Sequence, residues 1–313
     1  MSELRVGVVG LGSMGRRHAE TYLRLPGVRL TGVATPDPEK CEETAGLWNV
    51  IACQDYRDLT PHVDAVSVTT PTALHSEVVE HFISAGVHVL VEKPIAATEQ
   101  EAVRMVNMAA EAGVCLMVGH VERFNPAIIR LAARAAPRVK DSPSELRAFR
   151  MAPYDGRGCD IDVTLDLMIH DIDLVRMLHP GERCRVVQSQ SMSIESGRPD
   201  VALATLEISG GGAPPATVKL LASRIADQKR RMFEVRCKGF TAKADLVAQR
   251  LWIAEGGSEF EEIPVERESA LALELAHFVA SVRAGTPPAV SGQHGVEALR
   301  ICLDVIEHAA SVP

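Results

Sequence analysis

The feature that most constrains the fold is the run Gly10-Leu11-Gly12-Ser13-Met14-Gly15, which follows the apolar stretch Leu4–Val9. At this spacing the first glycine permits a tight turn and the second lets the backbone approach a pyrophosphate. The third lets a helix pack closely on the strand, and the helix amides hold the phosphates. The pattern therefore predicts dinucleotide binding, with a purely structural turn as the alternative. The cofactor-binding residues expected in this turn are Gly10, Gly12, Ser13, Met14 and Gly15.

The first 120 residues alternate short β-branched runs with helical segments. One helix is predicted from Thr98 to Ala112, with Thr98 and Glu101 at capping-box spacing and Gly113 as its stop. The runs are nearly continuous in apolar residues, as expected of strands covered on both faces. They predict an α/β fold, an N-terminal Rossmann domain over residues 1–120 with a doubly wound parallel sheet. The runs are Leu4–Val9, Val28–Ala34, Ala65–Thr69, Val87–Val91 and Val114–Val118.

The pattern changes after residue 120. Helices are predicted over Asn125–Ala136 and around Asp166–Leu178, and helices return in the last forty residues. Between Arg185 and Ile263 the chain forms a series of short alternating segments separated by turn residues, which is typical of antiparallel strands. We expect residues 121–313 to form a C-terminal α+β domain built on a mainly antiparallel sheet. The strands expected are Leu146–Met151, Val186–Ile194, Val201–Ile208, Thr217–Ser223, Met232–Cys237, Thr241–Asp245 and Arg250–Ala254.

The composition excludes several classes of protein. The chain has 313 residues and a formal net charge of −8, which argues against wrapping nucleic acid. Its uncharged stretches fall short of the roughly 18 residues that a membrane span needs, and it begins without a signal-peptide pattern, so we expect a cytoplasmic protein. The seven cysteines are scattered and form no Cys-x-x-Cys pair, which fits reduced thiols better than disulfides or a zinc ribbon.

The choice of dinucleotide depends on the end of the second predicted strand. NAD-specific sites place an acid there to bond the ribose hydroxyls. Here Thr35 occupies that position and Asp37 follows two residues later, while neither Arg nor Lys is in place for a 2′-phosphate. We expect NAD, with Thr35 and Asp37 at the ribose. The alternatives are NADP, or an Asp37 that only belongs to a turn.

A charged pair follows the fourth long apolar run, where Val91 leads into Glu92-Lys93-Pro94. The carboxyl ends of parallel strands face the crevice in which open α/β sheets bind ligands. A lysine there can donate to a substrate oxygen and stabilise a developing alkoxide. We expect Glu92 and Lys93 at the cofactor, Lys93 also at the substrate, and a cis Lys93–Pro94 bond. The alternative is a solvated lysine beside a turn.

Asp166 and His170 are four residues apart in a predicted helix, so their side chains share one face. A histidine is suited to accepting an alcohol proton near neutral pH, and a nearby carboxylate sets its tautomer or grips a hydroxyl. Two alternatives remain open, a solvated acidic face and a metal site. The second is disfavoured because no third ligand lies at a suitable spacing, and we expect no metal.

Two further segments are weaker candidates. Thr69, Thr70 and Pro71 follow a strand at the same sheet edge and, with His75, are expected near the cofactor; His75 is otherwise a polar surface residue. The segment Gly119–Pro126 lies at the inferred domain junction. Its side chains suit phosphate or sugar oxygens, although a hinge with an ion pair is the alternative. The substrate candidates there are His120, Arg123 and Asn125.

Taken together, the glycine turn, Glu92-Lys93-Pro94 and the Asp166–His170 pair resemble the Gfo/Idh/MocA oxidoreductase family over essentially the whole chain. The resemblance implies NAD(P)-dependent oxidation of a sugar or cyclitol hydroxyl, with Lys93, Asp166 and His170 as the catalytic trio and His170 as the base. It also implies that the C-terminal domain, residues 121–313, has a large open sheet, binds the substrate and often serves oligomerisation, here as a homodimer or homotetramer.

Two segments, Val118–Pro126 and Lys229–Gln249, are similar to those of the UDP-N-acetylglucosamine 3-dehydrogenases within this family. That similarity implies oxidation at C3 of UDP-N-acetylglucosamine, upstream of an aminotransferase. The alternatives are a dehydrogenase of a free sugar or inositol, and a non-catalytic dinucleotide-binding sensor. A sensor needs only the phosphate turn, so the presence of lysine, aspartate and histidine together argues against it.

Overall fold

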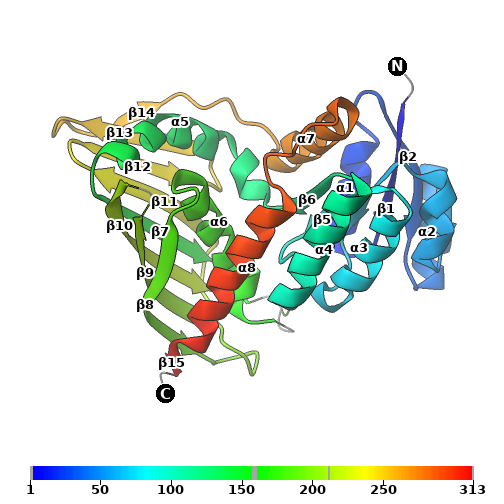
Figure 1. Ribbon diagram of the computed structural model, residues 1–313, viewed down its shortest axis with the longest axis horizontal. Helices are drawn as coiled ribbons and strands as arrows, with labels where there is room; N and C mark the ends of the chain where they lie inside the picture. Colours follow the sequence, from blue (N-terminus) through cyan, green and yellow to red (C-terminus); the bar gives the residue numbers. More distant parts are fainter. Residues whose placement is uncertain (1–2, 155, 157–160, 211, 312–313) are drawn as a thin grey trace. The chain divides into compact units, whose positions relative to one another are not determined.

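The computed structural model describes residues 3–154, 156, 161–210 and 212–311 (Figure 1). The chain forms two compact units. The first comprises Met1–His120 and Leu271–Val296, and the second comprises Val121–Ala270 and Glu297–Pro313. The sequence division at residue 120 coincides with the first boundary, but it assigns residues 271–296 to the second domain, whereas these residues return to the first unit. None of the described helices has the length and apolar character needed to cross a membrane.

The first unit is built on a six-stranded sheet with the order β3-β2-β1-β4-β5-β6. Every neighbouring pair is parallel, and β1, β4 and β6 are buried over most of their length. This is the strand order of a Rossmann fold, and it confirms the predicted doubly wound parallel sheet. The strands are β1 (Leu4–Val9), β2 (Val28–Ala34), β3 (Ile51–Cys53), β4 (Ala65–Val68), β5 (His88–Glu92) and β6 (Leu116–Gly119).

The helices of this unit begin and end at the predicted signals. In α4 the Thr98 side chain accepts from the Glu101 amide, the Glu101 side chain accepts from the Thr98 amide, and Gly113 ends the helix with a φ of 65°. The helix and its capping box are thus confirmed. The helices are α1 (Ser13–Tyr22), α2 (Pro38–Trp48), α3 (His75–Ser84), α4 (Glu99–Ala112) and most of α7 (Ala270–Ala284), with the 3-10 helix η1 (Tyr56–His62) after β3.

The second unit contains a nine-stranded sheet with the order β14-β13-β12-β11-β7-β10-β9-β8-β15. Among the described strands of this second sheet, only the pairs β7–β10 and β8–β15 are parallel. This confirms the predicted, mainly antiparallel sheet. The strands are β7 (Ser144–Met151), β8 (Arg183–Met192), β9 (Val201–Gly210), β10 (Ala213–Ser223), β11 (Arg230–Cys237), β12 (Phe240–Asp245), β13 (Arg250–Glu255), β14 (Glu261–Ile263) and β15 (Ala309–Ser311).

One face of this sheet forms the core of the second unit. Its inward side chains pack with buried residues of α5 (Pro126–Asp141), α6 (Ile169–Leu178) and the second half of α8 (Gly292–Glu307) (Figure 1). Along β7 buried residues alternate with partly exposed ones, as expected when only one face is covered. On the other face the strand register places Leu203, Leu221, Phe149 and Met232 in one row across four strands. Phe149 is 38% exposed and Leu203 is 46% exposed, so this open face carries an apolar row.

Candidate functional site

The glycine turn has the geometry that phosphate binding requires. Gly10 has a φ of 93°, and a Cβ on Gly15 would lie 1.8 Å from the Gly10 carbonyl oxygen, so neither position accepts a side chain. A Cβ on Gly12, by contrast, would meet no described atom within 4 Å. Gly12 is also the N-cap of α1 and offers no side-chain cap to the first amides of that helix. These amides and the open space at Gly12 fit a dinucleotide pyrophosphate.

The loop after β4 supports this turn. The Thr69 hydroxyl donates to the Gly10 carbonyl oxygen at 2.7 Å, which fixes the turn from the neighbouring strand. The Thr70 hydroxyl is buried and has no hydrogen-bond partner among the described residues. A buried hydroxyl without a partner is costly, so Thr70 is the residue of this loop best suited to bond a cofactor oxygen.

A cavity of about 360 Å³ lies beside the turn, at the carboxyl ends of β2 and β3. Thr35 and Thr70, which the sequence predicts near the cofactor, line this cavity, and Tyr56 and Arg57 line it as well. The Arg57 guanidinium stacks over the Tyr56 ring at 4.5 Å and forms ion pairs with Asp55 and Glu77. Sequence reasoning missed Tyr56 and Arg57, because β3 is only three residues long and was not predicted. Tyr56 and Arg57 come shortly after that strand, at the carboxyl edge of the sheet, and this position is the signal that could have identified them.

Asp37 acts as a helix cap. One carboxylate oxygen accepts from the amides of Glu39 and Lys40, and the other pairs with the Lys40 ammonium at 2.9 Å. The hydrogen bond from the Lys40 side chain, with help from these amides, lowers the pKa of Asp37. This arrangement favours the alternative in which Asp37 belongs to a turn rather than to the ribose site. Thr35 itself is 6% exposed.

Lys93 follows directly on β5, and the Lys93–Pro94 peptide bond is cis, as predicted. The Glu92 carboxylate accepts from the Lys93 amide at 3.3 Å and lies 3.1 Å from Nε2 of His18. Burial acts to raise the pKa of Glu92, but the hydrogen bond and charge of His18 and the charge of Lys93 outweigh it, so this pKa is lowered. Glu92 is therefore a carboxylate held inside the first unit, next to the lysine.

His75 is buried, with 1% of its surface exposed, so the alternative of a polar surface residue is wrong. Its Nδ1 lies 2.9 Å from the Pro94 carbonyl oxygen and its Nε2 lies 2.9 Å from the Thr70 carbonyl oxygen. The ring thus joins the loop after β4 to the loop after β5. The first unit brings together the glycine turn, Thr69, Thr70, His75, Glu92 and Lys93 at one edge of its sheet.

In the second unit Asp166 and His170 lie on a helix that begins with a π-helical turn. This turn, η4, spans Thr164–Met168, and α6 follows without a break. The sequence predicts the helix but not its wider first turn, in which Asp166 lies. Both Asp166 and His170 are half-buried. Single π-turns of this kind occur often at functional sites, because they re-aim side chains relative to a regular helix.

The other two acids of this helix are engaged in buried ion pairs. Arg150 contacts both oxygens of Asp171, at 2.7 and 3.0 Å, and also reaches Glu122 at 2.9 Å. Burial raises the pKa of Asp171, and Arg150 opposes that effect. Arg123 pairs with both oxygens of Asp173, at 2.7 and 2.8 Å. Asp171 and Asp173 thus hold this helix in place, and a chemical role for Asp166 and His170 stays a prediction.

The three junction candidates have different surroundings. His120 is buried at the end of the first unit. Arg123 belongs to the ion pair with Asp173, and Asn125 caps α5 by accepting from the Ala127 amide. The Asn125 amide group also donates to Glu122 and to the Leu246 carbonyl oxygen. For Arg123 and Asn125 these contacts favour the structural alternative over contact with a substrate.

The structure gives no sign of a metal centre or disulfide in the parts of the chain that it describes. Among residues 3–154, 156, 161–210 and 212–311, no group of three or more His, Cys, Asp or Glu side chains is arranged to hold a metal ion. The six cysteines in these ranges form no disulfide, and Cys159 lies outside them.

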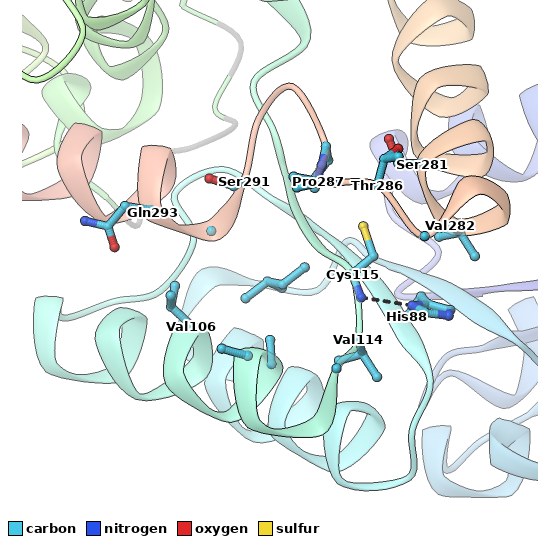
Figure 2. A pocket seen from close by; sticks show the side chains of 17 residues that line it. His88, Val106, Val114, Cys115, Ser281, Val282, Thr286, Pro287, Ser291 and Gln293 are labelled. Carbon is cyan, nitrogen blue, oxygen red and sulfur yellow. Dashed lines mark hydrogen bonds between the residues drawn. The ribbon is translucent and has the colours of Figure 1, made fainter.

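A second cavity of the first unit, of about 400 Å³, lies at the amino ends of β5 and β6 (Figure 2). Its walls are mostly apolar and come from α4 and from the segment that joins α7 to α8. His88 lies in it, and its Nδ1 accepts from the Cys115 amide at 2.9 Å. The glycine turn and Lys93 lie at the opposite ends of the strands, so this cavity is separate from the candidate cofactor site.

Comparison with known proteins shows the family to which the chain belongs. Residues 4–120 match the family model GFO_IDH_MocA, described as an oxidoreductase family with an NAD-binding Rossmann fold. The chain is 33% identical to UDP-N-acetylglucosamine 3-dehydrogenase of Acidithiobacillus ferrooxidans, over 97% of each chain. It is 28% identical to myo-inositol 2-dehydrogenase of Thermotoga maritima, over 95% of this chain and 93% of the relative.

Among solved structures, a UDP-N-acetylglucosamine 3-dehydrogenase from Acidithiobacillus ferrooxidans superposes with a TM-score of 0.90. The two chains share 32% identity, and the match covers 99% of this chain and 98% of the other. Similarity at this level over whole chains, together with the glycine turn and the Glu92-Lys93-Pro94 segment, establishes the family. The chain belongs to the Gfo/Idh/MocA oxidoreductase family and is an NAD(P)-dependent dehydrogenase acting on CH–OH groups.

Proposed function

We propose that this enzyme oxidises a ring hydroxyl of a sugar to a ketone, and that its substrate is the C3 hydroxyl of UDP-N-acetylglucosamine. The observation that carries the proposal is the position of Lys93, which follows β5 at the same sheet edge as the phosphate-binding turn. The relative that acts on UDP-N-acetylglucosamine matches 97% of this chain, which supports the choice of substrate.

In the proposed reaction three side chains act on the substrate. His170 accepts the hydroxyl proton, because an imidazole is suited to this task near neutral pH. The Lys93 ammonium stabilises the negative charge that develops on the oxygen, and Asp166 orients the substrate or the base. When bound, the dinucleotide supplies the two-electron acceptor for the ring carbon. The main task of the protein is to hold the ring carbon and the acceptor at reacting distance.

We infer that NAD is preferred over NADP. The cavity beside the glycine turn contains one cation, Arg57, among the described residues that line it. That guanidinium is already paired with Asp55 and Glu77, so the group carries a net negative charge. A 2′-phosphate placed near it would meet two carboxylates, whereas the ribose hydroxyls of NAD would not be repelled.

The experiment is a turnover assay in which NADH formation is followed with a panel of substrates. The proposal expects UDP-N-acetylglucosamine to give a kcat/KM at least about tenfold above N-acetylglucosamine, glucose and myo-inositol, and NAD to exceed NADP. A higher value with myo-inositol would instead support a dehydrogenase of free cyclitols, the second candidate, which the 28% identical relative favours. Cofactor binding without turnover on any member of the panel would support the sensor alternative.

Two partners are proposed on separate grounds. A second copy of the chain would cover the apolar row on the open sheet face, because an exposed row of this kind marks an interaction surface. This would give a homodimer or homotetramer. If the product is a 3-keto sugar nucleotide, an aminotransferase is the class of enzyme that would convert it to the 3-amino sugar. Detection of the ketone by mass after turnover tests that step.

A further inference from the structure

Two buried histidines approach the segment Glu92-Lys93-Pro94 from different helices of the first unit. His75, the first residue of α3, contacts the Pro94 carbonyl oxygen, and His18 of α1 contacts the Glu92 carboxylate. His75 is 1% exposed and His18 is fully buried. Neither ring is placed in the proposed chemistry, although each contacts a residue that directly adjoins Lys93.

His75 lies between two carbonyl oxygens, each 2.9 Å from a ring nitrogen. Carbonyls only accept, so a neutral ring donates to one of them at a time and an imidazolium donates to both. The ring lies between the two loops in either state, next to the loop whose Thr70 hydroxyl is buried. The contact with Pro94 is the one that holds the lysine loop to the first residue of α3.

His18 holds the other side of the segment through Glu92. The Glu92 carboxylate lies between His18 Nε2, at 3.1 Å, and the Lys93 amide, at 3.3 Å. A Cβ on Gly119 would lie 3.1 Å from this carboxylate, so the carboxylate is packed closely against β6. Because α1 also carries the phosphate-binding turn, this contact connects the turn to the backbone of Lys93.

We propose that His75 and the His18–Glu92 pair are positioning residues that hold the backbone of Lys93 in register with the cofactor. A lysine side chain is long and flexible, so the reach of its ammonium depends on where its backbone is anchored. A displacement of about 1 Å at a reacting group costs as much as 10²-fold in rate. The inference rests on the proposed role of Lys93 as the group that stabilises the oxyanion.

The test uses two conservative variants of His75, each retaining one of its two contacts. Asn carries its amide nitrogen near the position of Nδ1, so His75→Asn keeps the contact with Pro94. Gln carries its amide nitrogen near the position of Nε2, so His75→Gln keeps only the contact with Thr70. We expect His75→Gln to lower kcat by about 10- to 100-fold, and His75→Asn to stay within about threefold of the wild type.

A residue that only positions Lys93 should affect kcat and leave the binding of substrate and cofactor nearly unchanged. The KM for UDP-N-acetylglucosamine and the Kd for NADH should change by less than about threefold in His75→Gln. Hydrogen exchange of the cofactor-free protein provides a readout that does not depend on activity: deuterium uptake over residues 89–97 should rise in His75→Gln and not in His75→Asn. Glu92→Met, which removes the acceptor of the Lys93 amide, should lower kcat about tenfold and takes the place of His75→Gln if that variant does not fold.

The matched control is His88→Gln, at the opposite end of β5 (Figure 2). It also removes a part-buried histidine contact, but far along the strand from Lys93, so its kcat should equal that of the wild type. The proposal is overturned if His75→Gln and His75→Asn lower kcat equally, if neither lowers it, or if His88→Gln lowers it as much as His75→Gln.

Adding His75→Gln to Lys93→Ala separates this inference from the proposed function. If His75 acts through Lys93, the double variant is no slower than Lys93→Ala alone. If the effects multiply instead, the positioning role is overturned while the role of Lys93 stands. Wild-type kcat in Lys93→Ala would overturn the proposed function, and the inference with it.

Discussion

The two segments that carry the proposed chemistry are held in place by different interactions. Around Lys93 the first unit uses two buried histidines, one carboxylate and backbone carbonyl groups. Around His170 the second unit uses arginine–carboxylate pairs that are almost completely buried, Arg150 with Asp171 and Arg123 with Asp173. The lysine therefore depends on the placement of two loops, whereas the histidine depends on a helix fixed by ion pairs.

In the second unit, the ion pairs distinguish the residues that hold the helix in place from the residues that are proposed to react. Four acids and a histidine lie close together in sequence from Asp162 to Asp173, and any of them is a candidate by residue type. Asp171 and Asp173 are satisfied by arginines, and Asp162 accepts from the Thr164 amide at 2.7 Å. The ion pairs thus assign Asp171 and Asp173 to the support of this helix, whereas Asp166 and His170 are the residues proposed to react.

The largest effect is expected from breaking the ion pairs of the second unit. Arg150→Met leaves Asp171 buried without its guanidinium and Glu122 with Arg231 as its remaining guanidinium partner, which should lower the free energy of unfolding by about 3–5 kcal/mol. Urea unfolding measures this change. Arg147→Met is the matched control on the same strand: its pair with Glu145 is about a third exposed, and its loss should leave the free energy of unfolding almost unchanged. Equal losses of unfolding free energy in both variants would contradict the conclusion that the buried ion pairs hold the helix of the second unit in place.

A second effect concerns acid stability. The Asp200 carboxylate accepts from three amides and the Ser196 hydroxyl, and it faces Arg224. Burial acts to raise its pKa, but the hydrogen bonds from Ser196, Ile194 and Glu195 outweigh it and lower the pKa to about 2.

Between pH 4 and pH 2 the unfolded state therefore binds this proton more readily than the folded state, so stability falls as the pH falls. Asp200→Asn should be less stable than the wild type at pH 7, and this difference should shrink toward pH 2. Thermal unfolding at several pH values checks the prediction. A difference in Tm that does not depend on pH would count against it.

A smaller effect is expected at the open face of the nine-stranded sheet in the second unit. The sheet of the first unit has no such face along its buried strands. Phe149→Glu places a charge in the apolar row shared with Leu203, Leu221 and Met232. If a second copy covers this row, the dissociation constant of the oligomer should rise at least about tenfold. Sedimentation at several concentrations measures this dissociation constant. Thr217→Glu, on the same face of the sheet but on the neighbouring strand β10, serves as the control. An unchanged mass distribution in Phe149→Glu would exclude this face as the interface.

The smallest effect is expected at an exposed carboxylate of the first unit. Asp37 caps α2, and asparagine caps helices about as well as aspartate. Asp37→Asn should therefore leave the Tm almost unchanged and change the Kd for NADH by less than about twofold. A tenfold weaker binding of NADH, measured by fluorescence titration, would instead place Asp37 at the ribose.

Local patterns predict much of the first unit. The glycine turn, the capping box at Thr98 and the segment Glu92-Lys93-Pro94 each depend on residues close in sequence, and each is found as predicted where the structure tests it. The missed features in this unit depend on distant contacts. Strand β3 is three residues long, and residues 271–296 return to the first unit from far along the chain.

In the second unit, too, the features that the sequence does not predict depend on contacts between residues far apart in the chain, and there are more of them. Arg123 is 50 residues from Asp173, and Arg231 is 109 residues from its partner Glu122. Such pairs depend on which strands and helices become neighbours, and no spacing rule in the sequence encodes that. The sequence predicts Arg123 and Asn125 as substrate residues, and it does not reveal their contacts with Asp173, Glu122 and Leu246. The π-turn at Asp166 was also missed, since its apolar spacing does not differ from that of a regular helix.

The most direct test of the central claim is pre-steady-state NADH formation from NAD and UDP-N-acetylglucosamine in Lys93→Ala, His170→Ala and the double variant. We expect each single variant to form NADH at least about 10²-fold more slowly than the wild type, with the Kd for NADH changed by less than about threefold. The double variant should be no slower than the slower single variant, because both groups serve the same proton and charge transfer. Wild-type rates in either single variant would contradict the account.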